Sequence, residues 1–201
     1  PRPLPFTYNT ETLAPGSVEI EQYADWTYVK GISTSDGSPT GYGATQLQTE
    51  FEYGLAERLE LGIYFTYVPT PASTITGVAS QTEGTGLKQR LRYTFADPGA
   101  WPVDVGLYGE VVETDREIEF EAKVLLQRRF GALRLMTNLW GEYELYYQGN
   151  KDIVLNPTLG ATYEITPTVH VGAESWTRIE FPNPAPHPRP YGLGPVVYVG
   201  P

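Results

Sequence analysis

The stretch Leu59-Glu60-Leu61-Gly62-Ile63-Tyr64-Phe65-Thr66-Tyr67 changes from apolar to more polar at every step. Its odd-numbered residues are leucine, isoleucine, phenylalanine and tyrosine, and its even-numbered residues are glutamate, glycine, tyrosine and threonine. Successive side chains of a β-strand point to opposite faces, so a strand here has one apolar and one polar face. A helix would mix the two sets. The stretch therefore predicts a β-strand with two chemically different faces.

The same alternation recurs along the chain. We expect ten strands, at residues 17–29, 45–56, 58–68, 86–96, 102–113, 117–129, 132–146, 152–165, 168–181 and 190–200. In each run every second residue forms an apolar register, and these registers contain no Asp, Glu, Lys or Arg. Several runs exceed the ~5–6 residues of an ordinary soluble strand and approach the ~9–11 residues of a tilted strand that crosses a membrane.

The opposite register carries the charged side chains, which should gather on one face of neighbouring strands. We expect Lys88, Arg90 and Arg92 of one strand to lie between Glu60 and Glu110 of its two neighbours. Like charges on one strand repel unless opposite charges on the adjacent strands compensate them. The predicted charge network consists of Glu60, Lys88, Arg90, Arg92, Glu110, Glu119, Glu121, Lys123, Arg134, Glu142, Glu174 and Arg178.

The composition of the chain excludes or disfavours several kinds of protein and several kinds of site. The chain has 201 residues, a formal net charge of −10 and no cysteine, so disulfides and cysteine-ligated metal sites are excluded. An acidic chain without a basic stripe argues against binding to nucleic acid. No run of 18 apolar residues occurs, which argues against a transmembrane helix.

Two folds fit the alternation. A soluble, lipocalin-like ligand-binding barrel would bury Leu61, Ile63 and Phe65 around a dry cavity and leave Glu60 and Glu121 in water. A membrane barrel would turn the apolar register outward to lipid. The links favour the membrane barrel because short and long links alternate along the chain. Links are short near Ala56–Arg58, Asp97–Trp101, Arg129–Gly131 and Ile165–Thr168, and long near 30–43, 68–86 and 181–190.

Aromatic residues at the edges of the apolar runs point the same way, because amphipathic rings settle at the headgroup level of a membrane. They are Trp26, Tyr28, Tyr53, Tyr67, Tyr93, Tyr143, Tyr163 and Tyr191. We therefore predict an all-β, antiparallel up-and-down transmembrane β-barrel in a bacterial outer membrane, with the lipid bilayer as its partner.

Two segments of the chain can be compared with known families: residues 5–28, PFTYNTETLAPGSVEIEQYADWTY, and residues 49–67, TEFEYGLAERLELGIYFTY. They resemble bacterial outer-membrane β-barrel families of unassigned function, including barrels loosely described as transporters or as associated with phenol degradation. The shared features are a leader ending in ET-L-x-x-G before an acidic first strand, and the hairpin around Gly54–Gly62. The resemblance covers the first third of the chain and implies an architecture rather than an activity.

The two ends of the chain bound the predicted barrel. Residues 1–15 form a proline-rich leader, which we expect to lie across the mouth of the barrel or to be a mobile end, and residues 16–201 form the barrel. Barrels of this kind usually finish on an aromatic residue, whereas this chain finishes Tyr198-Val199-Gly200-Pro201. Either ten strands close the barrel, or a last hairpin is missing from a twelve-stranded parent, which we prefer.

The predicted interior is narrow and filled, because ten to twelve strands leave little more room than side chains need. Its charges form either an internal salt-bridge ladder in a structural membrane protein or a path for small polar or cationic solutes. A barrel enzyme acting on lipid is a further alternative, which would depend on His170 or His187. Ser175 and His170 face opposite sides of their strand, so we predict no catalytic residues, no metal site and no cofactor.

Overall fold

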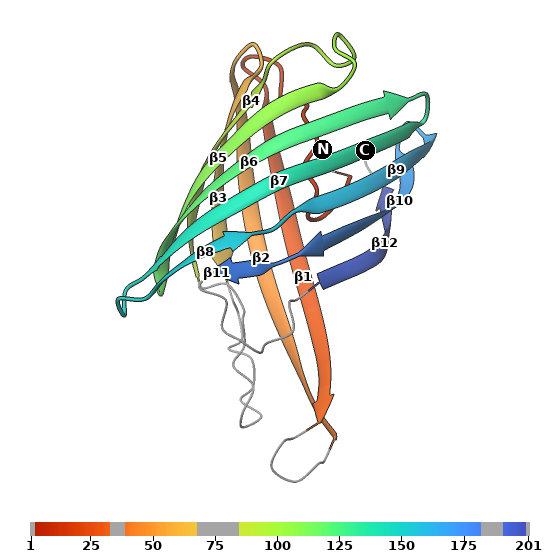
Figure 1. Ribbon diagram of the computed structural model, residues 1–201. Helices are drawn as coiled ribbons and strands as arrows, with labels where there is room; N and C mark the ends of the chain where they lie inside the picture. The colour runs from red at the N-terminus through yellow and green to blue at the C-terminus, as the bar shows by residue number, and fades with distance from the viewer. Residues whose placement is uncertain (1–2, 33–38, 68–84, 182–190, 200–201) are drawn as a thin grey trace.

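The computed structural model describes residues 3–32, 39–67, 85–181 and 191–199, which form one antiparallel sheet of twelve strands (Figure 1). This part of the chain contains no helix long and apolar enough to cross a membrane. The strands are β1 (Val18–Ile32), β2 (Pro39–Ala56), β3 (Leu59–Tyr67), β4 (Gly86–Thr94), β5 (Asp104–Thr114), β6 (Glu117–Phe130), β7 (Leu133–Tyr146), β8 (Lys151–Leu155), β9 (Thr158–Thr166), β10 (Val169–Thr177), β11 (Ile179–Phe181) and β12 (Tyr191–Val199).

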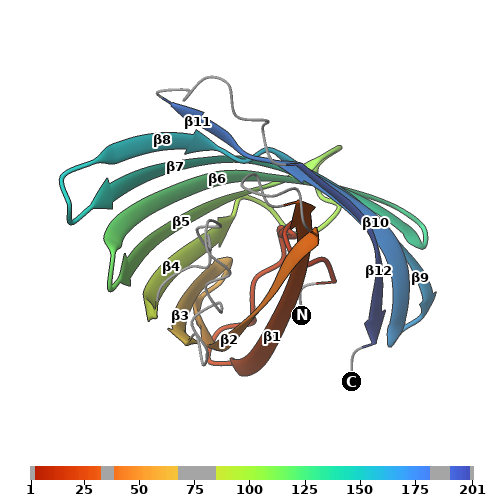
Figure 2. The same cartoon turned by 90° about the horizontal axis from the view of Figure 1, so that it is seen from below.

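The strands follow an up-and-down order in which each pairs with its neighbour along the chain from β1 to β7. The sheet continues through β9 and β10 to β12, and it curls around the N-terminal residues (Figure 2). Strands β1 and β12 are the two ends of this order and do not pair with each other. The all-β, antiparallel, up-and-down prediction is confirmed, whereas the sheet is curled and open rather than a closed barrel.

Two of the ten predicted runs are interrupted. Residues 152–165 are divided into β8 and β9, and residues 168–181 into β10 and β11, so ten runs give twelve strands. The first break falls at Asn156-Pro157, where proline has no N–H to offer to a ladder. Strand β7 pairs with β8 on one side of this break and with β9 on the other. The second break falls at Arg178, whose side chain binds Glu142 and Glu144.

Four connections lie at one end of the sheet, which we call the short-turn end: β2–β3, β6–β7 and β9–β10, of two residues each, and β4–β5, of nine residues. The opposite end also has a two-residue turn, between β5 and β6, so short links are not confined to one end as the sequence predicted. In the β2–β3 connection Arg58 adopts a positive φ of 64°, and its guanidinium binds Asp97 of the β4–β5 connection at 3.0 Å. Gly131 has φ 60° in the two-residue β6–β7 turn, a conformation that favours glycine. These turns set the register that places alternate residues on the same face.

The opposite end differs from the prediction at its first link. Residues 30–43 were expected to be a loop, but β1 extends to Ile32 and β2 begins at Pro39. Most of the predicted link is therefore strand, because pairing between β1 and β2 continues beyond the alternating part of each run. The predicted long link at 68–86 and the proline-rich link at 181–190 lie mostly outside the described residues.

The two faces of the sheet have opposite chemistry. Glu60 is fully buried on the concave face, whereas Phe65 of the same strand is 52% exposed on the convex face. Leu139 of β7 and Leu159 of β9 are likewise 56% and 61% exposed. This is the reverse of the arrangement that a soluble ligand-binding barrel required, in which leucine and phenylalanine line the cavity. The apolar register faces outward, and the charged register faces the space inside the curl, here called the interior.

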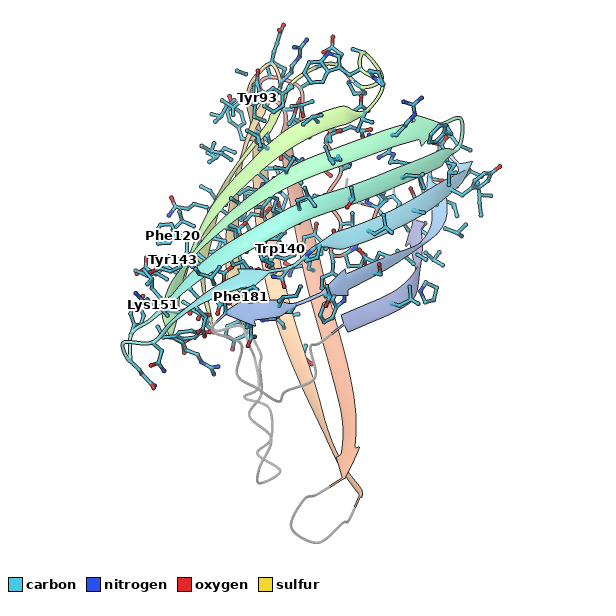
Figure 3. All side chains as sticks on the ribbon, viewed as in Figure 1. Tyr93, Phe120, Trp140, Tyr143, Lys151 and Phe181 are labelled. Carbon is cyan, nitrogen blue, oxygen red and sulfur yellow. The ribbon has the colours of Figure 1, made fainter. Side chains whose placement is uncertain are left out.

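Aromatic side chains lie toward both ends of the convex face. Figure 3 shows Tyr93 near the short-turn end and Phe120, Tyr143 and Phe181 toward the opposite end. All four are exposed, and Phe120 and Tyr143 are directly opposite one another on β6 and β7. Of the predicted edge aromatics, Tyr53, Tyr67, Tyr93, Tyr143 and Tyr163 are exposed. The side chains of Trp26, Tyr28 and Tyr191 lie outside the described part of the structure.

Candidate functional site: a charged interior occupied by the N-terminal segment

Two arginines of β4 bind three carboxylates in the short-turn half of the interior. Arg90 binds Glu50 at 3.0 Å and Glu60 at 2.5 Å, and it also contacts Glu52. Arg92 binds Glu60 at 2.7 Å. The side chains of Glu50, Glu60 and Arg90 are at most 1% exposed. We call these five residues the arginine cluster. Charges buried this deeply are tolerated because each has a partner of opposite sign.

The register of three strands creates this cluster. Glu52 of β2 is opposite Gly62 of β3, and Gly62 is opposite Arg90 of β4. A side chain at position 62 would place its Cβ 2.8 Å from Nε of Arg90. The glycine therefore leaves the space through which the guanidinium reaches across β3 to Glu52. The same guanidinium lies 5.2 Å from the ring centre of Tyr64 and 5.8 Å from that of Tyr108.

A second group, the acidic cluster, lies toward the opposite end of the interior. It consists of Glu110, Glu119, Glu121, Glu142 and Glu144 on β5, β6 and β7. Strand register makes like charges face each other, because Glu121 is opposite both Glu110 and Glu142, and Glu119 is opposite Glu144. Carboxylate oxygens of Glu119, Glu121 and Glu142 all lie within 4.8 Å of one another. Carboxylates this close need nearby cations or shared protons.

Cations border the acidic cluster. Lys123 binds Glu121 at 2.8 Å, and Arg178 binds Glu142 at 3.0 Å and Glu144 at 2.6 Å. The charge of Lys88, which is half-buried on β4, also acts on this group. Three carboxylate oxygens at this spacing are the kind of ligand set that holds a hard cation.

Aromatic rings surround the ammonium group of Lys123. Its Nζ lies 3.6 Å from the ring centre of Trp140, 4.1 Å from that of Tyr108 and 4.5 Å from that of Tyr8. The faces of aromatic rings attract cations, most strongly where water is excluded. Tyr8 belongs to neither strand nor turn of the sheet, so the N-terminal residues complete this enclosure.

Residues 3–14, here called the N-terminal segment, run through the short-turn half of the interior (Figure 2). The backbone N–H groups of Phe6 and Thr7 donate to the carboxylate of Glu174, each at 3.0 Å. Asn138 accepts from the Tyr8 N–H at 2.7 Å and donates to its carbonyl at 2.9 Å. Leu4, Thr7, Tyr8, Asn9 and Thr10 are all buried.

Further contacts hold the C-terminal part of the segment. The Leu13 N–H donates to Glu60 at 2.8 Å, and the hydroxyl of Thr94 donates to the carbonyl of Thr10. Glu11 binds Arg134 at 3.2 Å. The leader was expected across the mouth of the barrel or as a mobile end. It instead lies inside, because inward-facing polar side chains satisfy its main-chain groups.

A cavity of about 120 Å³ remains between the N-terminal segment and strands β1–β4. The charged residues that line it are Glu11, Glu19, Glu21, Glu50, Glu52, Glu60, Arg90 and Arg92. Six carboxylates and two guanidinium groups give this cavity an excess of negative charge, which favours cations.

The predicted charge network is divided among three environments. Glu60, Arg90 and Arg92 belong to the arginine cluster, and Arg90 turns toward β2 and β3 rather than toward Glu110, which accepts from the Tyr108 hydroxyl at 2.6 Å. Glu110, Glu119, Glu121 and Glu142 form the acidic cluster, with Lys88, Lys123 and Arg178 around it. Arg134 binds Glu11, and Glu174 accepts from the main chain of Phe6 and Thr7, so both bind the N-terminal segment.

Sequence reasoning missed the residues that recognise the N-terminal segment. Asn138 is an uncharged member of the inward register, and Tyr8 lies in a stretch without strand periodicity. Alternation identifies the face of a side chain but not its partner far along the chain. Of the residues considered for lipid chemistry, His170 lies 5.7 Å from Tyr198, ring centre to ring centre. His187 lies outside the described residues.

No family model, no curated protein and no solved structure matches this chain.

Proposed function

We propose that this chain is an integral protein of a bacterial outer membrane, whose interior forms a narrow path for small polar or cationic solutes that its own N-terminal segment closes. The observation that carries the proposal is the inverted distribution of side chains. Glu60 is fully buried whereas Leu139 and Leu159 are more than half exposed. Large contiguous apolar surfaces are unusual on soluble proteins and mark contact with membranes or partners.

Three features support a bilayer around the convex face. Its apolar registers carry no charged residue, and charge on a lipid-facing strand is costly. The long strands provide the length that a tilted transmembrane strand needs, ~9–11 residues. Exposed aromatics lie toward both ends, as in the girdles that flank the apolar band of outer-membrane barrels. The resemblance of residues 5–28 and 49–67 to such barrels agrees with this proposal.

The interior supports a preference for cations. The cavity beside the N-terminal segment has six carboxylates and two guanidinium groups, and the acidic cluster continues the negative lining toward the opposite end. Rings of acidic side chains select cations in narrow pores. The N-terminal segment obstructs the short-turn half of the same interior, so we expect the resting protein to be closed.

A structural membrane protein without any path is the second candidate. The fully packed rings of Tyr64 and Tyr108, which are at most 3% exposed, favour it. Weakening the N-terminal segment distinguishes the two candidates. With Phe6→Ala and Tyr8→Ala combined, we expect cation-selective current in planar bilayers where the unchanged protein gives little. Silence in both proteins would favour the structural candidate.

Membrane residence itself is tested with two arginines at different depths. Leu139→Arg lies at the middle of β7, and Tyr163→Arg lies near the short-turn end of β9, yet both side chains are more than half exposed. In vesicles with a hydrocarbon core of ~30 Å we expect Leu139→Arg to lower the free energy of unfolding by about 2–4 kcal/mol. Tyr163→Arg should cost at most about 1 kcal/mol. Equal, small effects would contradict the proposal, because two exposed positions in water tolerate arginine equally well.

A further inference from the structure

We propose that the interior is a binding site for a peptide, which residues 4–13 of the chain occupy as a tethered ligand. A separate peptide of the same chemistry binds there when the tethered segment withdraws. This inference rests on the proposed function, because it names the ligand class of the same interior. It goes beyond closure of a path, since it assigns a recognition site that acts in trans.

Side chains of the sheet bind the main chain of the N-terminal segment. Glu174 accepts two successive backbone N–H groups, from Phe6 and Thr7. Asn138 then binds both the N–H and the carbonyl of Tyr8, which is the pattern by which one peptide strand reads another. Glu60 accepts the N–H of Leu13 further on. A small solute does not offer a series of amide groups, whereas a peptide does.

Side-chain contacts add sequence preference. Phe6 packs against Trp176 with ring centres 5.7 Å apart, and Tyr8 packs against Tyr108 at 5.0 Å. Leu4 lies directly over Gly160, where any larger residue would overlap its side chain. Leu4 and Tyr8 are buried, whereas Phe6 is 46% exposed. The ligand is therefore a peptide with an apolar residue followed, at every second position, by two aromatic residues.

The segment is separable from the sheet. It lies outside every described strand, because β1 begins only at Val18. It is held by the side chains of Glu60, Asn138 and Glu174, so these bonds to the segment are not part of the main-chain ladder of the sheet. The connection at residues 14–17 is exposed and contains Pro15 and Gly16, the latter with φ 79°. Main-chain hydrogen bonds tie this connection to β2, from the Gly16 N–H to the Gly54 carbonyl at 2.8 Å and from the Gly54 N–H to the Ser17 carbonyl at 3.0 Å. Withdrawal of residues 4–13 therefore requires a change before Gly16 and leaves the strand pairing in place.

The experiment measures fluorescence anisotropy of a labelled peptide with the sequence of residues 3–14, added to the full chain in phosphatidylcholine vesicles. In the unchanged protein the tethered segment competes at an effective concentration in the millimolar range. With Phe6→Ala and Tyr8→Ala in the chain, the recognising side chains remain and the tethered competitor weakens. We expect apparent affinity for the peptide to rise by at least about tenfold.

A peptide carrying the same two alanines is the matched ligand control and should bind weakly. Adding Asn138→Ala to the chain should abolish the gain. The inference is overturned if the labelled peptide binds the Phe6→Ala, Tyr8→Ala protein no better than the unchanged protein, while circular dichroism reports an intact sheet in both. Cation-selective current through the Phe6→Ala, Tyr8→Ala protein without any peptide binding would likewise overturn the inference. The proposed function would then still stand.

A disulfide lock tests the same site with the native aromatic residues in place. The chain has no cysteine, so Leu4→Cys with Gly160→Cys introduces one defined pair at a point of direct contact. We expect peptide binding to fall when this pair is oxidised and to return on reduction. Binding that is equal in both states would place the peptide elsewhere and contradict the inference.

Discussion

The arginine cluster and the acidic cluster both bury carboxylates on the same concave face, but the buried charge is compensated differently in each. In the arginine cluster one guanidinium contacts Glu50, Glu52 and Glu60 at once. In the acidic cluster strand register sets glutamate opposite glutamate, with cations at the border. The first cluster pairs its carboxylates directly with guanidinium groups, whereas in the second the carboxylates face one another and rely on cations at the edge.

The position of the N-terminal segment sharpens this contrast. It binds Glu60 of the arginine cluster through Leu13, and it contributes Tyr8 to the rings around Lys123 at the edge of the acidic cluster. It therefore completes the first cluster and only borders the second. The proposed closure of the path therefore lies in the short-turn half, and the acidic cluster lies beyond it.

The largest expected effect concerns Arg90. Replacing Arg90 with methionine removes the shared partner of three buried carboxylates, and breaking a buried ion pair on one side costs about 3–5 kcal/mol. We expect a loss of this size in the free energy of unfolding, measured by denaturant titration in vesicles. Arg178→Met is the matched control, with a smaller loss because the Arg178 side chain is 26% exposed. Equal losses would remove the distinction between the clusters.

A smaller effect, of opposite sign in the two clusters, follows from removing one carboxylate charge. Glu52→Gln deprives Arg90 of a buried partner and should destabilise the protein by about 1–3 kcal/mol. Glu119→Gln relieves repulsion from Glu121 and Glu144, and should stabilise it by about 0.2–1 kcal/mol. Denaturant titration of both variants checks the signs. Destabilisation by Glu119→Gln would mean that the acidic cluster is as fully compensated as the arginine cluster.

The sequence predicts the faces of the strands better than the partners of their side chains. Alternation around Leu61 is a local property, so it identifies strands and the side to which each residue points. The breaks at Pro157 and Arg178 were missed, because one lost rung of a ladder does not disturb a period of two. The N-terminal segment was missed for another reason. Its contact with Glu174 joins residues about 167 positions apart, and no local pattern encodes that distance.

The open edge of the sheet was also beyond prediction. Repeating alternation predicts a sheet with two faces, but closure depends on whether β1 and β12 meet, and the structure leaves them unpaired. The direction of Arg90 was likewise undetermined, since the arginine lies between acidic residues on both neighbouring strands. The missing side chain of Gly62 decides it, by opening the way toward Glu52.

The most direct test of the central claim compares two adjacent residues of β7. Leu139 is exposed on the convex face, and Trp140 is half-buried in the interior beside Lys123. Leu139→Cys and Trp140→Cys, each labelled with the same fluorophore, are placed in vesicles containing lipids brominated on their acyl chains. We expect strong quenching at position 139 and little at position 140. Membrane residence would be contradicted if quenching at position 139 were absent, or equal to that at position 140, and the same chain also stayed folded without lipid or detergent.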